Sequence, residues 1–463
     1  MRHLLIVLWV GTALSTVFAV SVSVSAQSNV KPTKSAPIDD ARPQSNGIRK
    51  LASRHLVLYT DLPSSPEIDR LPEIFDQAVP QWAEYFGVDE SKTASWKARA
   101  FLIGDRRRFD ALGLMPLGND KFINGISIGS DLWLYDQPTD YYQRHLLLHE
   151  GTHVFMTSFL GGCGPGWYME GTAELMATHR LDDSGRLTLR FMPPDRSEVP
   201  MLGRIKLIRD AVAKGRSLSF TEVLQIDNRE QLGNEAYAWC WAAAKFLDTH
   251  PRYRGRFQRL KKHVRDPEFN QIVHKEFDRD WSDLIAEWPA FVATLDYGYD
   301  FERMAIKFRQ GTRLTSSPRS VTIAADRGWQ TSGVRLDAGK SYRVTASGRY
   351  EIVAGEIDGV AETWPCEPGG VTIEYHDGKP LGMLLGAIVS RTADASSARA
   401  TLADEFAIGL NATIAPAADG TLYLRVNESA SQLADNRGEL AVTIEAVTVG
   451  PSSKNQGRNT NFR

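Results

Sequence analysis

The stretch HLLLHEGTHVFM, residues 145–156, decides the kind of fold this chain adopts. Histidines stand at every fourth position, His145, His149 and His153, and Glu150 lies inside the last interval. In a helix, residues four apart share one face, so His149 and His153 present two imidazoles to one ion, and Glu150 reaches a water molecule held there. The alternative is the buried face of an ordinary helix, and a third ligand would separate the two interpretations.

A candidate third ligand follows in GPGWYMEGTAEL, residues 164–175. The glycine-rich turn before it lets a second helix run back alongside the first. Glu170 then reaches the ion, and Glu174, one helical turn later, accepts the outer N–H of a ligating histidine. Three ligands and one open position are what a catalytic zinc ion requires. We expect His145 to pack behind the site, and His179 to lie at the surface or cap a helix.

HEGTH followed by WYMEGTAEL resembles the gluzincin metallopeptidases, in particular the peptidase MA-like proteins, whose second motif has the form W-x-x-E-G-x-A-E. The resemblance covers residues 50–300 and implies an α+β zincin-like catalytic domain, a small N-terminal sheet followed by a helical bundle. The spacing before Glu170 is slightly shorter than in thermolysin-like members, which affects the loop more than the ligands. The resemblance implies the zinc ligands His149, His153 and Glu170, the general base Glu150, and Glu174 behind the ligands.

Tyr237 is the candidate donor to the oxyanion that forms when a peptide carbonyl is attacked. In aminopeptidase-N-like relatives a tyrosine in a Y-x-x-G-A context does this, with a leucine ten positions later, and Tyr237 stands ten before Leu247. The glycine is absent here. Two interpretations stay open: a catalytic tyrosine, or aromatic packing together with Trp239 and Trp241.

The mode of substrate binding is indicated by what precedes the metal helix. Aminopeptidase-N-like enzymes hold the substrate's free amine with a G-x-M-E-N segment, and none occurs here. NGISIGSDLWLYD, residues 124–136, stands in its place and alternates like a strand. An exposed strand aligns an extended peptide through backbone hydrogen bonds. The sequence therefore favours an endopeptidase over an aminopeptidase.

The last third of the chain has short β-rich runs between turn signals, typical of a β-sandwich or jelly roll. LYLRVNESASQLADNRGELAVTI, residues 422–444, is similar to the calcium-dependent galactose-binding bacterial lectins. The resemblance implies Ca²⁺ and sugar at Glu428, Asp435 and Asn436, whose oxygens suit that ion. Glu428 replaces an aspartate and Gln432 a threonine, so a sandwich that only docks or extends the enzyme stays open.

The N-terminal residues combine a basic start, an apolar run and the cleavage-type triplet Val24-Ser25-Ala26, as in a signal peptide. Secretion or a periplasmic location follows, with an uncleaved membrane anchor as the alternative. The segments we expect are a signal peptide 1–26, a flexible linker 27–49, a metallopeptidase-like domain 50–305, a lectin-like β-sandwich 318–450 and a disordered tail 451–463.

Composition limits the partners. Lys and Arg total 54 against 56 Asp and Glu, so the net charge of −2 gives no reason to expect nucleic acid or an anionic membrane. Three cysteines are few for an exported chain, and Cys163 with Cys240 is the one disulfide we expect.

These patterns predict a secreted zinc metallopeptidase that acts on a peptide or protein, and on a glycoprotein if the C-terminal domain binds carbohydrate. Two alternatives stay open. One is a glycan-binding adhesin whose metal site is structural or inactive, and the other is a zinc hydrolase of non-peptide substrates.

Overall fold

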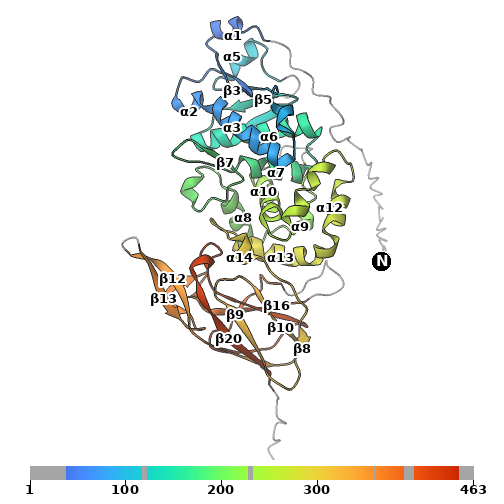
Figure 1. Cartoon of the computed structure of the whole chain (residues 1–463), viewed down its shortest axis with the longest axis vertical. Helices are drawn as coiled ribbons and strands as arrows, with labels where there is room; N and C mark the ends of the chain where they lie inside the picture. Colours follow the sequence, from blue (N-terminus) through green and yellow to red (C-terminus); the bar gives the residue numbers. More distant parts are fainter. Residues whose placement is uncertain (1–37, 117–121, 228–232, 358–359, 391–400, 448–463) are drawn as a thin grey trace, which may run out of the picture.

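The computed structural model describes residues 38–116, 122–227, 233–357, 360–390 and 401–447. Figure 1 shows an elongated molecule in which a sheet and helices at one end are followed by strands at the other. The order expected from the sequence, an α+β part followed by a β part, is confirmed. We call the region of residues 41–304 the α+β part and the region of residues 312–446 the β part.

A five-stranded sheet opens the α+β part, in the order β1-β2-β3-β5-β4. The strands are β1 Arg49–Ala52, β2 Leu56–Thr60, β3 Ala98–Ile103, β4 Gly125–Ile128 and β5 Asp131–Tyr135. Strands β2, β3 and β5 are parallel, whereas β1 and β4 pair antiparallel at the two edges. The strand expected at 124–136 is therefore a hairpin, and its first arm, β4, is an edge strand.

The two faces of this sheet pack differently because successive side chains on a strand point to opposite sides. Leu56 belongs to the main core, which the sheet shares with α3 Leu71–Phe86 and α6 Asp140–Leu160. Tyr59 belongs to a smaller aromatic cluster, which includes α5 Arg106–Ala111. Helix α6, which carries the histidines, thus lies on the face that holds the main core.

The rest of the α+β part is mainly helical. Its helices are α7 Gly166–Ala177, α8 Arg204–Ala213, α9 Phe220–Val223, α10 Asn234–Thr249, α11 Arg254–Phe257, α12 Phe269–Phe277, α13 Trp281–Thr294 and α14 Phe301–Met304. Shorter elements are α1 Ala41–Ser45, α2 Pro66–Asp69, α4 Glu90–Thr93 and the hairpin of β6 His179–Leu181 with β7 Leu187–Leu189. Helix α7 packs against both α6 and α10 and so links the two motifs to the downstream helices.

The β part contains two larger sheets, ordered β17-β16-β19-β10-β8 and β13-β12-β20-β11-β18, with β9 also paired to β20. Side chains from both sheets form one core, as expected for layered sheets. The strands are β8 Thr312–Arg313, β9 Arg319–Ala324, β10 Gln330–Leu336, β11 Tyr342–Ser347, β12 Tyr350–Ile357, β13 Val360–Cys366, β14 Val371–His376, β15 Lys379–Leu381, β16 Leu384–Val389, β17 Phe406–Ala407, β18 Asn411–Ile414, β19 Gly420–Val426 and β20 Arg437–Ala446.

The two parts are packed together at their junction. Ala430 and Leu433, in the loop between β19 and β20, are buried in the main core of the α+β part. The backbone N–H of Asp300 donates to the carbonyl of Ala430 over 2.9 Å. Ala290 of α13 in turn joins a cluster with Trp329 of the β part. The loop that carries the predicted calcium and sugar residues is therefore also a contact between the parts.

The expected terminal segments fall largely outside the described residues. The signal peptide 1–26, residues 27–37 of the linker 27–49 and the tail 451–463 belong there. Residues 38–49 of the expected linker contain α1 and pack onto the sheet, where Asp40 accepts a hydrogen bond from the Tyr59 hydroxyl over 2.6 Å. Within the described ranges, no helix has both the length and the apolar character needed to cross a membrane. The domain limits 50–305 and 318–450 stay a prediction.

Candidate metal centre

Helix α6 presents its histidines as a stripe on one face. Thr139 caps its start by accepting the N–H of Tyr142 over 3.2 Å, and Gly161 ends it in a left-handed conformation, φ 76°. The helix runs unbroken for 21 residues, so the four-residue spacing of the histidines becomes a spatial row. His149 and His153 are both buried in this row.

Helix α7 brings the two glutamates against that row. It starts after Pro165, and Glu170 and Glu174 are both buried on it. A Cβ added at Gly171, between them, would stand 2.5 Å from the carbonyl oxygen of Cys240 on α10. Glycine is thus needed at this position because it lets α7 and α10 approach closely.

The three predicted zinc ligands, His149, His153 and Glu170, converge on one point. His149 Nε2 lies 3.1 Å from Glu170 Oε2 and 3.2 Å from His153 Nε2. His153 Nε2 lies 3.4 Å from Glu170 Oε2. Ligand atoms around a tetrahedral zinc ion, with bonds of about 2.0–2.1 Å, are roughly 3.3–3.4 Å apart. The donor set of two imidazoles and one carboxylate therefore fits a metal ion in both chemistry and spacing.

The pKa values of these groups also indicate that a cation is favoured at this point. Burial raises the pKa of Glu170, but His153 and the contact with His149 outweigh it and bring the pKa to about 2. Burial lowers the pKa of His149, but contacts with Glu170 and Glu174 raise it to about 9. Without a metal, the cluster draws in protons, and a divalent cation would take their place.

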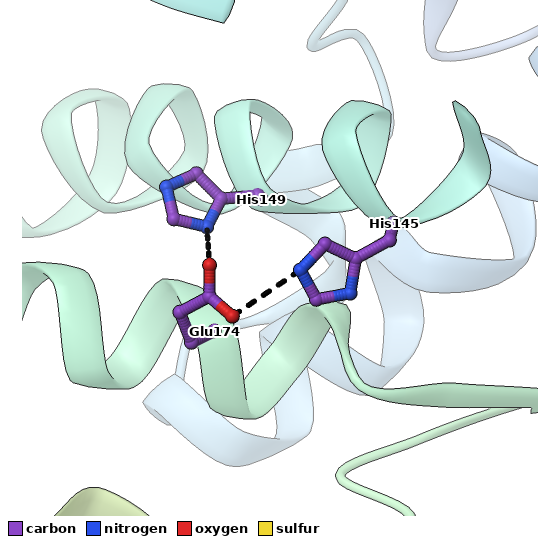
Figure 2. A group of neighbouring side chains, drawn as sticks. All are labelled: His145, His149 and Glu174. Atoms are coloured by element: carbon purple, nitrogen blue, oxygen red, sulfur yellow. Dashed lines mark ion pairs between the residues drawn. The ribbon is translucent and has the colours of Figure 1, made fainter. Parts of the chain in front are cut away.

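Glu174 occupies the position behind the ligands. Its Oε1 lies 3.2 Å from His149 Nδ1, and its Oε2 lies 3.3 Å from His145 Nε2 (Figure 2). The predicted contact of Glu174 with a ligand's outer nitrogen is thus present as a close approach. His145 stacks on Tyr142 with ring centroids 5.4 Å apart, and so packs behind the site as expected.

Arg204, which the sequence did not single out, completes this outer layer. Its Nε and Nη2 each donate to the Glu174 carboxylate over 2.8 Å, and the side chain is buried. His145, His149 and Glu174 also form a group of the kind that holds metals. Because Arg204 already neutralises Glu174, a cation is favoured at Glu170 and not here.

Glu150 lies between the metal centre and the sheet edge. It is buried, and burial raises the pKa of its carboxyl while His149 and His153 oppose the rise. A Cβ added at Gly125 of β4 would stand 3.0 Å from Glu150 Oε1, so the strand passes directly over this carboxylate. A carboxyl of raised pKa beside a metal site has the properties of a general base.

Tyr237 reaches the same region from α10. Its ring meets the ring of His149 edge-on, with centroids 6.0 Å apart and an angle of 68°. Burial, followed by the charges of Glu170 and Glu150, raises the pKa of Tyr237, so its hydroxyl keeps its proton at neutral pH. The residue is only half-buried, unlike Trp239 and Trp241, which are packed in the core.

One expectation near the site is wrong, and a second is correct in part. Cys163 and Cys240 are free thiols: Cys163 Sγ lies 3.5 Å from Thr157 Oγ1 at the end of α6, whereas Cys240 is buried on α10. His179 is not at the surface, but its Nδ1 lies 2.8 Å from the carbonyl oxygen of Ala177, the last residue of α7, as expected of a residue that caps the helix end. It is fully buried, and its ring stacks on Tyr141 at 4.5 Å because the chain turns inward into β6 where α7 ends.

The C-terminal candidate residues lie near the junction of the two parts and differ in burial. Glu428 and Asn436 are buried, whereas Asp435 is exposed. The N–H of Ser429 donates to Glu428 Oε1 over 2.8 Å. Glu428 Oε2 and Asn436 Oδ1 are buried without a hydrogen-bond donor among the residues that the structure describes. Burial, with Asp435 and Glu374 nearby, raises the pKa of Glu428 to about 8.

Comparisons with known proteins add two likenesses. No family model matches the chain, and no curated protein does. Among solved structures, the N-terminal domain of EclA, described as a PllA-like lectin, is 21% identical with a TM-score of 0.21, and the match covers 28% of this chain and 95% of that one. IMPa from Pseudomonas aeruginosa, solved in complex with an O-glycopeptide, is 12% identical with a TM-score of 0.17. That match covers 84% of this chain and 37% of IMPa, so this chain corresponds to little more than a third of IMPa. Both TM-scores are well below 0.5.

Proposed function

We propose that this chain is an exported zinc-dependent metallopeptidase. The observation that carries the proposal is the convergence of His149 Nε2, His153 Nε2 and Glu170 Oε2 within 3.1–3.4 Å of one another. A zinc ion held by these atoms would supply a Lewis acid that makes a water molecule nucleophilic at neutral pH. The N-terminal signal-like segment supports secretion or a periplasmic location.

The chain's own residues supply the other steps. Glu150 takes the proton of the attacking water on its carboxylate and passes it to the leaving amine. Tyr237, protonated and close to His149, donates a hydrogen bond to the oxyanion of the attacked carbonyl. The outer side of β4, which pairs with no other strand that the structure describes, would pair with the backbone of an extended substrate next to Glu150, which supports an endopeptidase acting on peptides or proteins.

The first experiment is zinc analysis of the full chain, wild type beside Glu170→Ala, with casein as an unfolded protein substrate. One zinc per chain, lost with Glu170 and accompanied by cleavage, supports the metallopeptidase. Stoichiometric zinc without cleavage of casein favours the adhesin with a structural site, or a zinc hydrolase of other substrates. The absence of zinc from the wild type would refute both zinc hydrolases and a structural zinc site, and would leave residues 145–156 as an ordinary helix face.

A second proposal concerns calcium in the β part. The unsatisfied oxygens of Glu428 and Asn436 support a hard cation there, completed by Asp435. Ala430 in the same loop is buried against the α+β part and Asp435 is exposed, so a sugar would reach such an ion from the side of Asp435. Recognition of a glycoprotein through this ion is therefore testable by calcium titration, followed by galactose titration of the calcium-loaded chain.

A further inference from the structure

Arg204 contacts both Glu174 and Tyr237. It is the first residue of α8, and it is buried with 6% of its surface exposed. Its two hydrogen bonds to Glu174 are parallel, Nε to Oε2 and Nη2 to Oε1, both 2.8 Å long. This fork geometry fixes the plane of the carboxylate as well as its position.

With its plane fixed, the Glu174 carboxylate can orient both the proposed ligand His149 and His145, which lies behind it. With Arg204 in place, Glu174 Oε1 is directed at His149 Nδ1, 3.2 Å away, and Oε2 at His145 Nε2, 3.3 Å away. A carboxylate that is free to rotate would not hold the outer nitrogen of His149 in one direction. Groups that orient a ligating histidine from behind affect metal affinity about 10- to 100-fold.

The other contact of Arg204 is with Tyr237. The guanidinium carbon lies 5.6 Å from the centre of the Tyr237 ring, within the range of a cation–π interaction. The same ring meets His149 edge-on. Tyr237 is thus held between the guanidinium and the imidazole, on a helix that packs closely against α8.

We propose that Arg204 is a positioning residue that couples the metal ligand His149, through Glu174, to the oxyanion donor Tyr237. The inference rests on the proposed peptidase function and deepens it. Lysine cannot substitute fully, because a single ammonium neither forms the parallel pair of hydrogen bonds nor stacks flat on a ring. Loss of Arg204 therefore weakens zinc binding and also displaces Tyr237.

The test uses the full chain with Arg204→Lys and Arg204→Met, each alone and combined with Tyr237→Phe. Zinc affinity is measured by competition with a chromophoric chelator, and kcat and KM on fluorescently labelled casein. Arg209→Met is the matched control, because Arg209 lies on the same helix but is exposed and pairs with Asp296. We expect zinc affinity to fall about 10- to 100-fold in Arg204→Met and less in Arg204→Lys, with no change in the control.

The combined variants test the link to Tyr237. In the wild-type background Tyr237→Phe should lower kcat about 100- to 1000-fold, and in either Arg204 background by a clearly smaller factor, because the donor is already displaced. Wild-type zinc affinity in both Arg204 variants, or an unchanged effect of Tyr237→Phe, would overturn the inference. If Arg204→Met does not fold, Arg204→Lys is used to measure both the zinc affinity and the effect of Tyr237→Phe on kcat. Failure of the proposed function is recognised separately, because the wild type itself would then lack zinc or cleavage, and the inference would fall with it.

Discussion

Glu150 lies directly beneath the backbone of Gly125. A Cβ at Gly125 would stand 3.0 Å from Glu150 Oε1 and 3.1 Å from its Cγ. The edge strand and the proposed general base are therefore in contact, and only a residue without a side chain leaves the carboxylate where it is. A substrate paired with β4 would be held next to this carboxylate.

Gly125→Ala should impair catalysis without loss of the metal. The added methyl group pushes Glu150 aside by a few tenths of an ångström or more, and misplacement of a catalytic group costs roughly tenfold to a hundredfold in rate. Turnover of labelled casein and zinc content would be measured together. Gly255→Ala is the control, because a Cβ there meets nothing within 4 Å. Equal turnover in both variants would contradict the predicted contact.

Glu150→Gln should keep zinc and abolish hydrolysis. The amide has nearly the same shape but cannot accept a proton, and loss of a general base costs about 10²- to 10⁴-fold. Elemental analysis checks that the metal remains, and the casein assay measures the loss. A variant that still cleaves at the wild-type rate would exclude Glu150 from the proton transfer.

Removal of zinc should destabilise the α+β part. The buried cluster of His149, His153 and Glu170 would bind the proposed ion only when folded, and free zinc at 100 times its Kd would add about 2.7 kcal/mol to the free energy of unfolding. Thermal unfolding with and without a chelator measures this difference. Glu170→Ala should show a much smaller chelator effect, and a shift as large as that of the wild type would place the ion elsewhere.

Glu428 should make stability fall with rising pH when calcium is absent. Its pKa rises from an ordinary 4.5 to about 8 in the folded state, chiefly through burial, while Asp435 and Glu374 add to the rise and Arg425 opposes it. The folded state therefore binds more protons than the unfolded state between these values. The stabilisation present below pH 4.5 is lost as pH rises towards 8, by roughly 5 kcal/mol at most.

Denaturant unfolding of the wild type and Glu428→Gln across this pH range measures that effect. The variant should lack the decline, because glutamine does not titrate. Calcium should restore the stability of the wild type at pH 8 but not that of the variant. The same pH dependence in both proteins would show that Glu428 titrates normally.

Leu433→Ala should destabilise both parts, although Leu433 belongs to a β-part loop. The side chain is 2% exposed and lies in the main core of the α+β part, where truncation of a leucine costs about 2–5 kcal/mol. Chemical unfolding followed by tryptophan fluorescence measures the loss. Leu410→Ala, on a half-exposed leucine of the β part, is the control. A loss confined to one of two separate transitions would contradict joint packing.

The local features of the site could be predicted from sequence because they depend on short spacings. Four-residue intervals on α6 place His149 and His153 together, and Glu174 follows Glu170 by one turn of α7. Arg204 could not be predicted in this way, because no periodic pattern links the start of α8 to Glu174. Such a contact depends on how distant helices pack.

The errors have similar causes. Gly129 and Ser130 lie between two alternating runs, and the left-handed Gly129, φ 64°, turns the single expected strand into the hairpin β4–β5. His179 follows the end of α7, a position that is often exposed, yet packing on Tyr141 buries it. Cys163 and Cys240 both belong to the region of the site, but membership of one region does not bring two thiols within bonding distance, and both are free.

The burial of Ala430 and Leu433 also governs where this chain can be cut for study. A fragment that ends near residue 305 would expose the apolar surface that these two side chains cover. An isolated β part would lose the surface against which its β19–β20 loop packs. Exposed apolar patches of this kind promote self-association. Expression of either half by itself should therefore give aggregation-prone material, whereas the undivided polypeptide is the proper unit for crystallisation and enzymology.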